Sequence, residues 1–149
     1  MATDPDPKDL YQQVIMQHNR SPVGFERDED APIVIEAYNP LCGDRFTLYL
    51  DWADGKLCRA RFFGYGCAIS KASTSVLMER IEGKSPVEIR ALIDLMCCVA
   101  EPGCGLPDDL PDELRAFSAA RRFPARKTCV TLSWEALAAH MRERASGKG

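Results

Sequence analysis

The period of apolar residues along the chain changes from helical to strand-like and then back to helical. Apolar side chains recur every three or four positions over residues 8–19, which predicts an amphipathic helix. Residues 33–38 are rich in β-branched side chains, residues 45–52 alternate strictly between apolar and polar, and residues 57–63 place arginines opposite small and apolar side chains. The Asp54-Gly55 pair between the last two segments is typical of a hairpin turn. These segments predict a three-stranded antiparallel meander with one face exposed to water.

Beyond the predicted sheet, helical spacing returns. Residues 67–81 carry apolar side chains among small ones, and a Ser-Pro pair opens a second helical stretch over residues 85–99. A shorter helix is expected over residues 111–120 and a last one over residues 130–144. The order of one helix, three strands and four helices predicts an α+β fold. We expect a single domain over residues 1–149, with the helices packed on one face of a small three-stranded antiparallel sheet.

Length and composition narrow the possible classes of protein. The chain has 149 residues, of which 46% are hydrophobic, enough for one domain with a substantial core. Lys and Arg number 19 against 22 Asp and Glu, a net charge of −3, so no positive surplus indicates a nucleic-acid partner. No apolar run approaches the roughly 18 residues that cross a bilayer, and the acidic N-terminal segment does not resemble a signal peptide. We therefore expect a cytoplasmic protein that binds neither nucleic acid nor membrane.

The seven cysteines are the most informative part of the composition. An odd number cannot all pair within the chain, and a cytoplasmic protein keeps its thiols reduced, so a disulfide framework is not expected. Such cysteines are usually buried apolar residues, metal ligands or nucleophiles. Cys58 shares a predicted strand face with Ala60 and Phe62, and it is therefore expected to lie in the core.

Three cysteines lie at the boundaries of predicted elements. Cys42 lies in the link between the first two strands, Cys67 lies between the third strand and the next helix, and Cys129 directly precedes the last helix. In an antiparallel meander the first link and the end of the third strand emerge at the same end of the sheet, so Cys42 and Asp44 are expected to lie close to Cys67. The helix N-termini expected at Cys67 and Cys129 would favour their thiolate forms.

Three thiolates and the Asp44 carboxylate form a four-ligand set for a tetrahedral cation. Zn²⁺ accepts both sulfur and oxygen and is the first choice. Iron held by thiolates is the second. The alternative is that Cys42, Cys67 and Cys129 are three ordinary loop cysteines, because the sequence contains no CxxC pair.

The remaining cysteines and His18 give less indication of a functional site. Cys97 and Cys98 are neighbours on a predicted helix and point about 100° apart. A second metal site that also uses Cys104 is the alternative, but no carboxylate or histidine is placed to complete it, so we expect one buried thiol and two incidental ones. His18 is interpreted as a residue that caps the C-terminal end of the first helix.

Four short segments resemble the IscU/SufU group of iron–sulfur cluster assembly proteins. The resemblance runs from about residue 10 to residue 140. The long separation between Cys67 and Cys129, and a threonine instead of a histidine before Cys129, make the chain most similar to the SufU type. The segments are LYQQVIM over residues 10–16, NPLCGD over 39–44, GCAIS over 66–70, and FPAR followed by CVTLSW within 123–134.

The resemblance implies a zinc-dependent sulfurtransferase that takes persulfide sulfur from a SufS-type cysteine desulfurase and passes it to downstream iron–sulfur assembly proteins. Its implied zinc ligands are Cys42, Asp44, Cys67 and Cys129. Cys42 is the expected sulfur acceptor because it lies in a turn between a proline and a glycine, and Arg126 is expected to offset part of the negative charge of the site. Two alternatives remain open: a scaffold that binds a nascent [2Fe–2S] cluster on the same four residues, and a structural zinc protein that acts as an adaptor.

Overall fold

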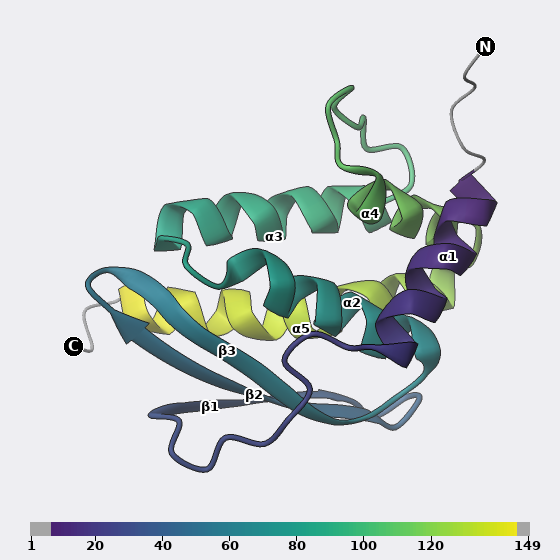
Figure 1. Ribbon diagram of the computed structural model, residues 1–149. Helices are drawn as coiled ribbons and strands as arrows, with labels where there is room; N and C mark the ends of the chain where they lie inside the picture. Colours follow the sequence, from purple (N-terminus) through teal and green to yellow (C-terminus); the bar gives the residue numbers. More distant parts are fainter. Residues whose placement is uncertain (1–6, 146–149) are drawn as a thin grey trace.

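Helices cover one face of a three-stranded sheet in the computed structural model, which describes residues 7–145 (Figure 1). The N-terminal segment, in which no signal peptide is expected, lies outside these residues. Within residues 7–145, no helix is both long and apolar enough to cross a membrane. The elements are α1 (Pro7–Arg20), β1 (Ile33–Asn39), β2 (Asp44–Ala53), β3 (Lys56–Tyr65), α2 (Ala68–Ile81), α3 (Pro86–Ala100), α4 (Asp112–Arg115), the 3₁₀ helix η1 (Ala116–Arg122) and α5 (Pro124–Ala145).

The predicted antiparallel meander is confirmed, with strand order β1-β2-β3. Asp54 and Gly55 both have positive φ, which is the geometry of a two-residue hairpin turn. The register pairs Asn39 with Asp44 and Arg45 with Tyr65. The β1–β2 turn and the end of β3 therefore lie at the same end of the sheet, as the sequence predicts.

Cys58 does not lie in the core, and the prediction made for it is wrong. The β2–β3 register shifts between Asp51 and Trp52, so that Leu57 pairs with Trp52 and Cys58 is left without a partner in the ladder. This bulge reverses the alternation at the start of β3: Leu57 is buried and Cys58 is exposed. A strictly alternating pattern cannot reveal such an insertion.

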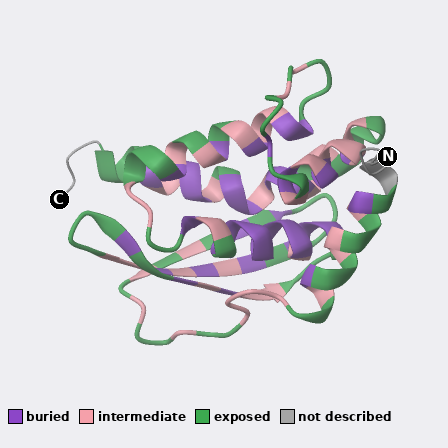
Figure 2. Ribbon diagram, turned by 45° about the horizontal axis from the view of Figure 1, so that its top comes forward, coloured by how far each residue is buried: buried purple, intermediate pink, exposed green. Residues whose placement is uncertain are grey.

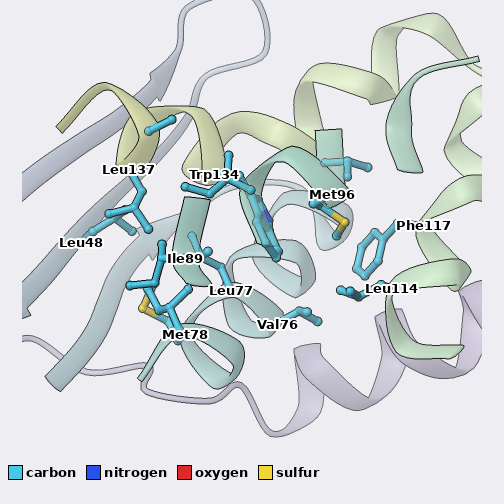
Figure 3. Packing of buried hydrophobic residues seen from close by; sticks show 14 of the residues in the cluster. Leu48, Val76, Leu77, Met78, Ile89, Met96, Leu114, Phe117, Trp134 and Leu137 are labelled. Carbon is cyan, nitrogen blue, oxygen red and sulfur yellow. The ribbon is translucent and has the colours of Figure 1, made fainter. Parts of the chain in front are cut away.

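The helices form two layers over the sheet. α2 and α5 lie side by side against the strands, and α3 packs on the outer side of α5 (Figure 1). α2 is buried on nearly all sides because strands, α1 and α5 surround it (Figure 2). The centre of the core lies where α2, α3, η1 and α5 meet, around Leu77, Met96, Phe117 and Trp134 (Figure 3). The predicted α+β fold with its helices on one face is confirmed.

The C-terminal helix begins earlier than its apolar pattern predicts. α5 starts at Pro124 instead of residue 130, so Cys129 lies within the helix and not before it. Proline suits the first position of a helix, since its φ is already helical and its missing N–H has no partner to lose there. The short helix predicted over residues 111–120 corresponds to α4 and η1 together.

Cys98 and Cys104 form a disulfide, where two incidental thiols were expected. The chain turns back after α3 through Gly103, which has a positive φ, and this turn brings the two Cα atoms to 5.5 Å. Arg121 donates hydrogen bonds to the carbonyl oxygens of both cysteines, at 2.9 and 2.7 Å. The folding of this loop, which spacing alone does not show, accounts for the wrong prediction.

Candidate metal centre

The β1–β2 turn carries the first two candidate ligands. Its backbone is closed by a hydrogen bond from the Gly43 N–H to the carbonyl oxygen of Asn39 at 2.8 Å. Gly43 has a φ of 76°, a backbone conformation that residues with a side chain rarely adopt. This conformation lets the chain reverse within the turn. As a result Cys42 and Asp44 lie on either side of this glycine with their side chains together: the Cys42 thiol donates to Asp44 Oδ2 at 3.3 Å.

Cys67 enters the same site from the end of β3. Gly64 makes this possible, because a Cβ atom there would lie 2.2 Å from the carbonyl oxygen of Arg45. The Cys67 sulfur caps α2 by accepting a hydrogen bond from the Ser70 N–H at 3.4 Å. The backbone N–H of Cys67 donates to Asp44 Oδ1 at 3.0 Å. The predicted closeness of Asp44 and Cys67 is confirmed.

Cys129 is positioned by hydrogen bonds between α2 and α5. The Ser73 hydroxyl donates to the carbonyl oxygen of Val130, the residue directly after Cys129, at 2.5 Å. The same hydroxyl oxygen accepts a hydrogen bond from Trp134 Nε1 at 2.8 Å. Both groups are buried, so the bonds hold this part of α5 firmly on α2 and fix the place from which the thiol reaches the site.

The structure brings the four predicted ligands together, three of them most closely. The ligand atoms of Cys42, Asp44 and Cys129 all lie within 4.8 Å of one another. The sulfur of Cys67 lies outside this group of three, since it faces Ser70. It is nevertheless close enough to Cys129 to influence that thiol electrostatically.

The electrostatics of the site favour a bound cation. The Asp44 side chain is buried, and within residues 7–145 no Lys or Arg forms a salt bridge with it. Burial raises the pKa of Cys129 to about 12, and the neighbouring Cys67 adds to this shift. The expectation that a helix N-terminus favours the Cys129 thiolate is therefore wrong. The pKa of Cys42 is also raised, first by desolvation and then by the Asp44 carboxylate.

The donor set matches what zinc binds in proteins. The sulfur atoms of Cys42 and Cys129 and a carboxylate oxygen of Asp44 lie together, and Cys67 lies beside them at the N-terminus of α2. A buried carboxylate without a counter-ion is costly, and so is crowding several thiolates around it. A divalent cation at this point would remove both costs, and Zn²⁺ accepts this combination of ligands.

A cavity of about 680 Å³ opens beside the site, between α1 and the start of α5. Cys67, Cys129 and Arg126 line one side of it, and one face of α1 lines the other. The Arg126 guanidinium lies 5.1 Å from the ring centre of Phe123. The α1 face consists of Tyr11, Gln12, Ile15 and Met16.

The contribution of α1 to this cavity was not predicted from the sequence. Residues at positions 11, 12, 15 and 16 lie on one face of a helix by their spacing, but spacing does not reveal what that face covers. The Tyr11 hydroxyl is buried without a hydrogen bond of ordinary geometry. Burial raises its pKa, and the neighbouring Arg126 partly opposes this rise.

His18 lies in the last turn of α1, as predicted, but its side chain bonds to other helices instead of capping this one. Its ring is buried, with Nδ1 at 2.7 Å from Ser75 Oγ and Nε2 at 2.8 Å from Glu113 Oε2. Arg80 donates to the other carboxylate oxygen of Glu113 at 2.9 Å. These bonds join α1 to α2 and α4. With Arg80 paired to Glu113, these bonds form a structural network between the three helices.

Three comparisons place the chain among known proteins. Residues 10–101 match the family described as NifU-like N terminal domain. The chain is 38% identical over 132 residues to the zinc-dependent sulfurtransferase SufU of Bacillus subtilis, covering 86% of each protein. It is 34% identical over 130 residues to the iron–sulfur cluster assembly scaffold protein IscU of Thermotoga maritima, covering 87% of this chain and 91% of that protein.

A solved structure extends the similarity to three dimensions. It is the structure of an iron–sulfur cluster assembly scaffold protein for the SUF system from Fervidobacterium islandicum, with a TM-score of 0.79 and 30% identity. The match covers 88% of this chain and 96% of that one. The comparisons thus include proteins named for sulfur transfer and proteins named as scaffolds.

Proposed function

This chain belongs to the family of NifU-like N-terminal domains that includes the IscU and SufU iron–sulfur cluster assembly proteins, and we propose that within this family it is a zinc-dependent sulfurtransferase. In this proposal it takes persulfide sulfur from a cysteine desulfurase and passes it on for cluster assembly. Zinc is held by Cys42, Asp44, Cys67 and Cys129. The relative with 38% identity, named as such a sulfurtransferase, supports this choice over the scaffold function.

The observation that carries the proposal is the difference in exposure within the site. Cys42 is exposed on a surface turn, whereas Asp44 beneath it is only 3% exposed and Cys129 is half-buried. Cys67 is exposed as well, but its sulfur caps α2 and its backbone N–H is bound to Asp44. Cys42, which lies on a turn, is therefore the thiol that a partner protein can reach while the other groups stay in place. A closed structural zinc site has no need of one exposed, separable ligand.

The transfer itself balances without any other reactant. The Cys42 thiolate attacks the terminal sulfur of the desulfurase persulfide and forms a new sulfur–sulfur bond. The old bond breaks, and the desulfurase cysteine leaves as its thiolate. The outcome is a persulfide on Cys42, with no net oxidation or reduction.

The surrounding residues assist this step in distinct ways. When bound, zinc supplies the positive charge that keeps the thiols ionised at neutral pH. Asp44 holds the turn against Cys67 through its hydrogen bond at 3.0 Å, so the site keeps its shape when the Cys42 side chain moves. We propose that Arg126, which lines the adjoining cavity with Cys67 and Cys129, offsets part of the negative charge of the ligands.

The test is the turnover of a cysteine desulfurase with and without this protein. The wild-type protein is expected to stimulate turnover, and mass spectrometry should then find one added sulfur atom on the peptide that contains Cys42. The Cys42→Ala variant should give no stimulation. Cys58→Ala is the matched control, because Cys58 is also exposed but lies at the far end of the sheet, and it should behave as wild type.

Metal content as isolated distinguishes the proposal from its alternatives. We expect about one Zn²⁺ per chain. Iron as the principal metal would favour the scaffold that binds a [2Fe–2S] cluster. Zinc without any stimulation of the desulfurase would favour the structural adaptor, and sulfur on Cys67 or Cys129 with an active Cys42→Ala variant would show that the acceptor is wrongly assigned.

A further inference from the structure

The cavity between α1 and α5 has the chemistry of a binding site for a small anion with an apolar body. Its described lining includes one formally charged group, the Arg126 guanidinium, and no Asp or Glu. Within residues 7–145, Arg126 forms no salt bridge with a carboxylate. The neighbouring Tyr11 hydroxyl has no hydrogen-bond acceptor of ordinary geometry. Both groups are donors that a carboxylate would satisfy.

The remaining lining fits a short carbon chain. Ile15 and Ile69 form apolar walls, and Met16 at the rim is 57% exposed. A volume of about 680 Å³ falls in the range of small-molecule sites and is too small for a folded segment of a partner. Cys67 and Cys129 line the same cavity as Arg126.

We propose that this cavity binds a small thiol that carries a carboxylate, and that this thiol accepts sulfur from the protein. The inference rests on the proposed sulfurtransferase function and names its low-molecular-weight acceptor. Arg126 and Tyr11 hold the carboxylate, and the thiol points toward the sulfur cluster. Because the Cys42 and Cys129 sulfurs lie within 4.8 Å of each other, a persulfide on Cys42 is within reach of the cavity.

The transfer step is again an exchange between sulfur atoms. The thiolate of the bound molecule attacks the terminal sulfur of the Cys42 persulfide. A bond forms between these two sulfurs, the bond to Cys42 breaks, and Cys42 leaves as a thiolate. The product is a small persulfide, and no oxidant or reductant is consumed.

The rate experiment uses the zinc-loaded protein carrying a Cys42 persulfide. Sulfur release is measured with 3-mercaptopropionate, which carries a carboxylate, and with 2-mercaptoethanol, which is neutral. Arg126→Gln should slow release to 3-mercaptopropionate by about tenfold more than release to 2-mercaptoethanol, the effect of losing a charge-assisted hydrogen bond to the carboxylate. Comparing each variant with wild type for the same thiol removes differences in thiol reactivity.

Two variants on the surface distinguish a charge change at the cavity from one outside it. Gln12→Glu adds a negative charge to the exposed α1 side of the cavity and should also slow release to 3-mercaptopropionate selectively. Arg122→Gln removes the same charge as Arg126→Gln from an exposed position outside the cavity and should change neither rate. Equal slowing of both thiols by Arg126→Gln would overturn the proposal.

A binding experiment separates this inference from the proposed function. The methyl resonances of Ile15 and Met16 are followed by NMR while 3-(methylthio)propionate, which cannot accept sulfur, is added to the zinc-loaded protein. Saturable shifts that are lost in Arg126→Gln support the cavity even if the protein never acquires a persulfide. The absence of shifts at millimolar ligand, or shifts of the same size in Arg126→Gln, would overturn the inference. The cavity would then be assigned to the binding of a side chain of a partner protein.

Discussion

Asp44 accepts a hydrogen bond from the backbone N–H of Cys67 at 3.0 Å. The bond joins the β1–β2 turn to the N-terminus of α2, so two candidate metal ligands also hold each other in place. The same carboxylate accepts a hydrogen bond from the Cys42 thiol. Asp44 therefore has a structural task in addition to any bond to a metal.

The two tasks of Asp44 can be separated by comparing two variants. Asp44→Asn keeps an oxygen acceptor for the Cys67 N–H but loses the charge, while Asp44→Ala loses both. Without metal, Asp44→Ala should be less stable than Asp44→Asn by about 1 kcal/mol, because the hydrogen bond from the Cys67 N–H is lost. Both variants should bind zinc more weakly than wild type. Urea unfolding with a chelator and a zinc competition assay measure these effects, and equal stability of the two variants would contradict the role of the bond.

Zinc binding should release protons. Because the pKa of Cys129 is raised to about 12 and that of Cys42 is raised above its usual value, both thiols are protonated at pH 7 without metal. Bound zinc requires thiolates, so at least two protons leave, and the affinity should fall by roughly a hundredfold for each pH unit of acidification. Calorimetry in two buffers of different ionisation enthalpy counts the protons.

Cys58→Ser is the control for this measurement, since Cys58 lies outside the site and its loss should leave the proton count unchanged. A count near zero for the wild-type protein would mean that the thiols are already ionised or do not bind the metal. Cys129→Ser should lower the count by one.

The part of the site that comes from the meander could be predicted from sequence. Strict alternation in β2 and the Asp54-Gly55 turn fix which ends of the strands meet, and this brings Asp44 to Cys67. Cys129 was assigned to the right cluster for a partly wrong reason, since it lies inside α5 and its thiol resists ionisation. The start of that helix depends on Pro124 and on packing against α2, which no apolar period encodes.

Other features depend on contacts between distant residues. The bulge that exposes Cys58 is a property of the β2–β3 pairing, not of either strand alone. The cavity wall on α1 and the bonds of the buried His18 to Ser75 and Glu113 exist only once α1 has packed on α2. Periodicity predicts that a helix has an inner face, but it does not identify the partner of that face.

The Cys98–Cys104 disulfide should contribute to stability but not to the metal site. Thiol titration of the unfolded, unreduced, chelator-treated protein should find five free cysteines, and reduction should raise the number to seven. Because the bond closes a short loop, replacing both residues by Ser should cost about 2 kcal/mol or less. Zinc content should not change, because neither cysteine belongs to the candidate metal site. Arg121 still holds the end of α3 through its hydrogen bond to the carbonyl oxygen of Val99. Loss of a zinc equivalent in the folded double variant would contradict this.

Glu113 should make the fold sensitive to acid. Its hydrogen bond to His18, with further help from Arg80, lowers the pKa of Glu113 to about 2. A lowered pKa in the folded state stabilises the protein above the ordinary carboxyl pKa, and this stabilisation is lost as the pH falls from about 5 to 2. At pH 7, Glu113→Gln should therefore be less stable than wild type by about 1–2 kcal/mol, allowing for solvent screening of a half-buried group.

The difference between wild type and Glu113→Gln should shrink below pH 5 and disappear near pH 2. Asp112→Asn is the matched control, because it removes an exposed carboxylate from the same short helix, and its stability should follow that of wild type throughout. Urea unfolding of the three proteins at a series of pH values measures both effects. If the Glu113→Gln difference stayed constant from pH 7 to pH 2, the charge of Glu113 would have no part in joining α1 to α4, and only its packing would matter.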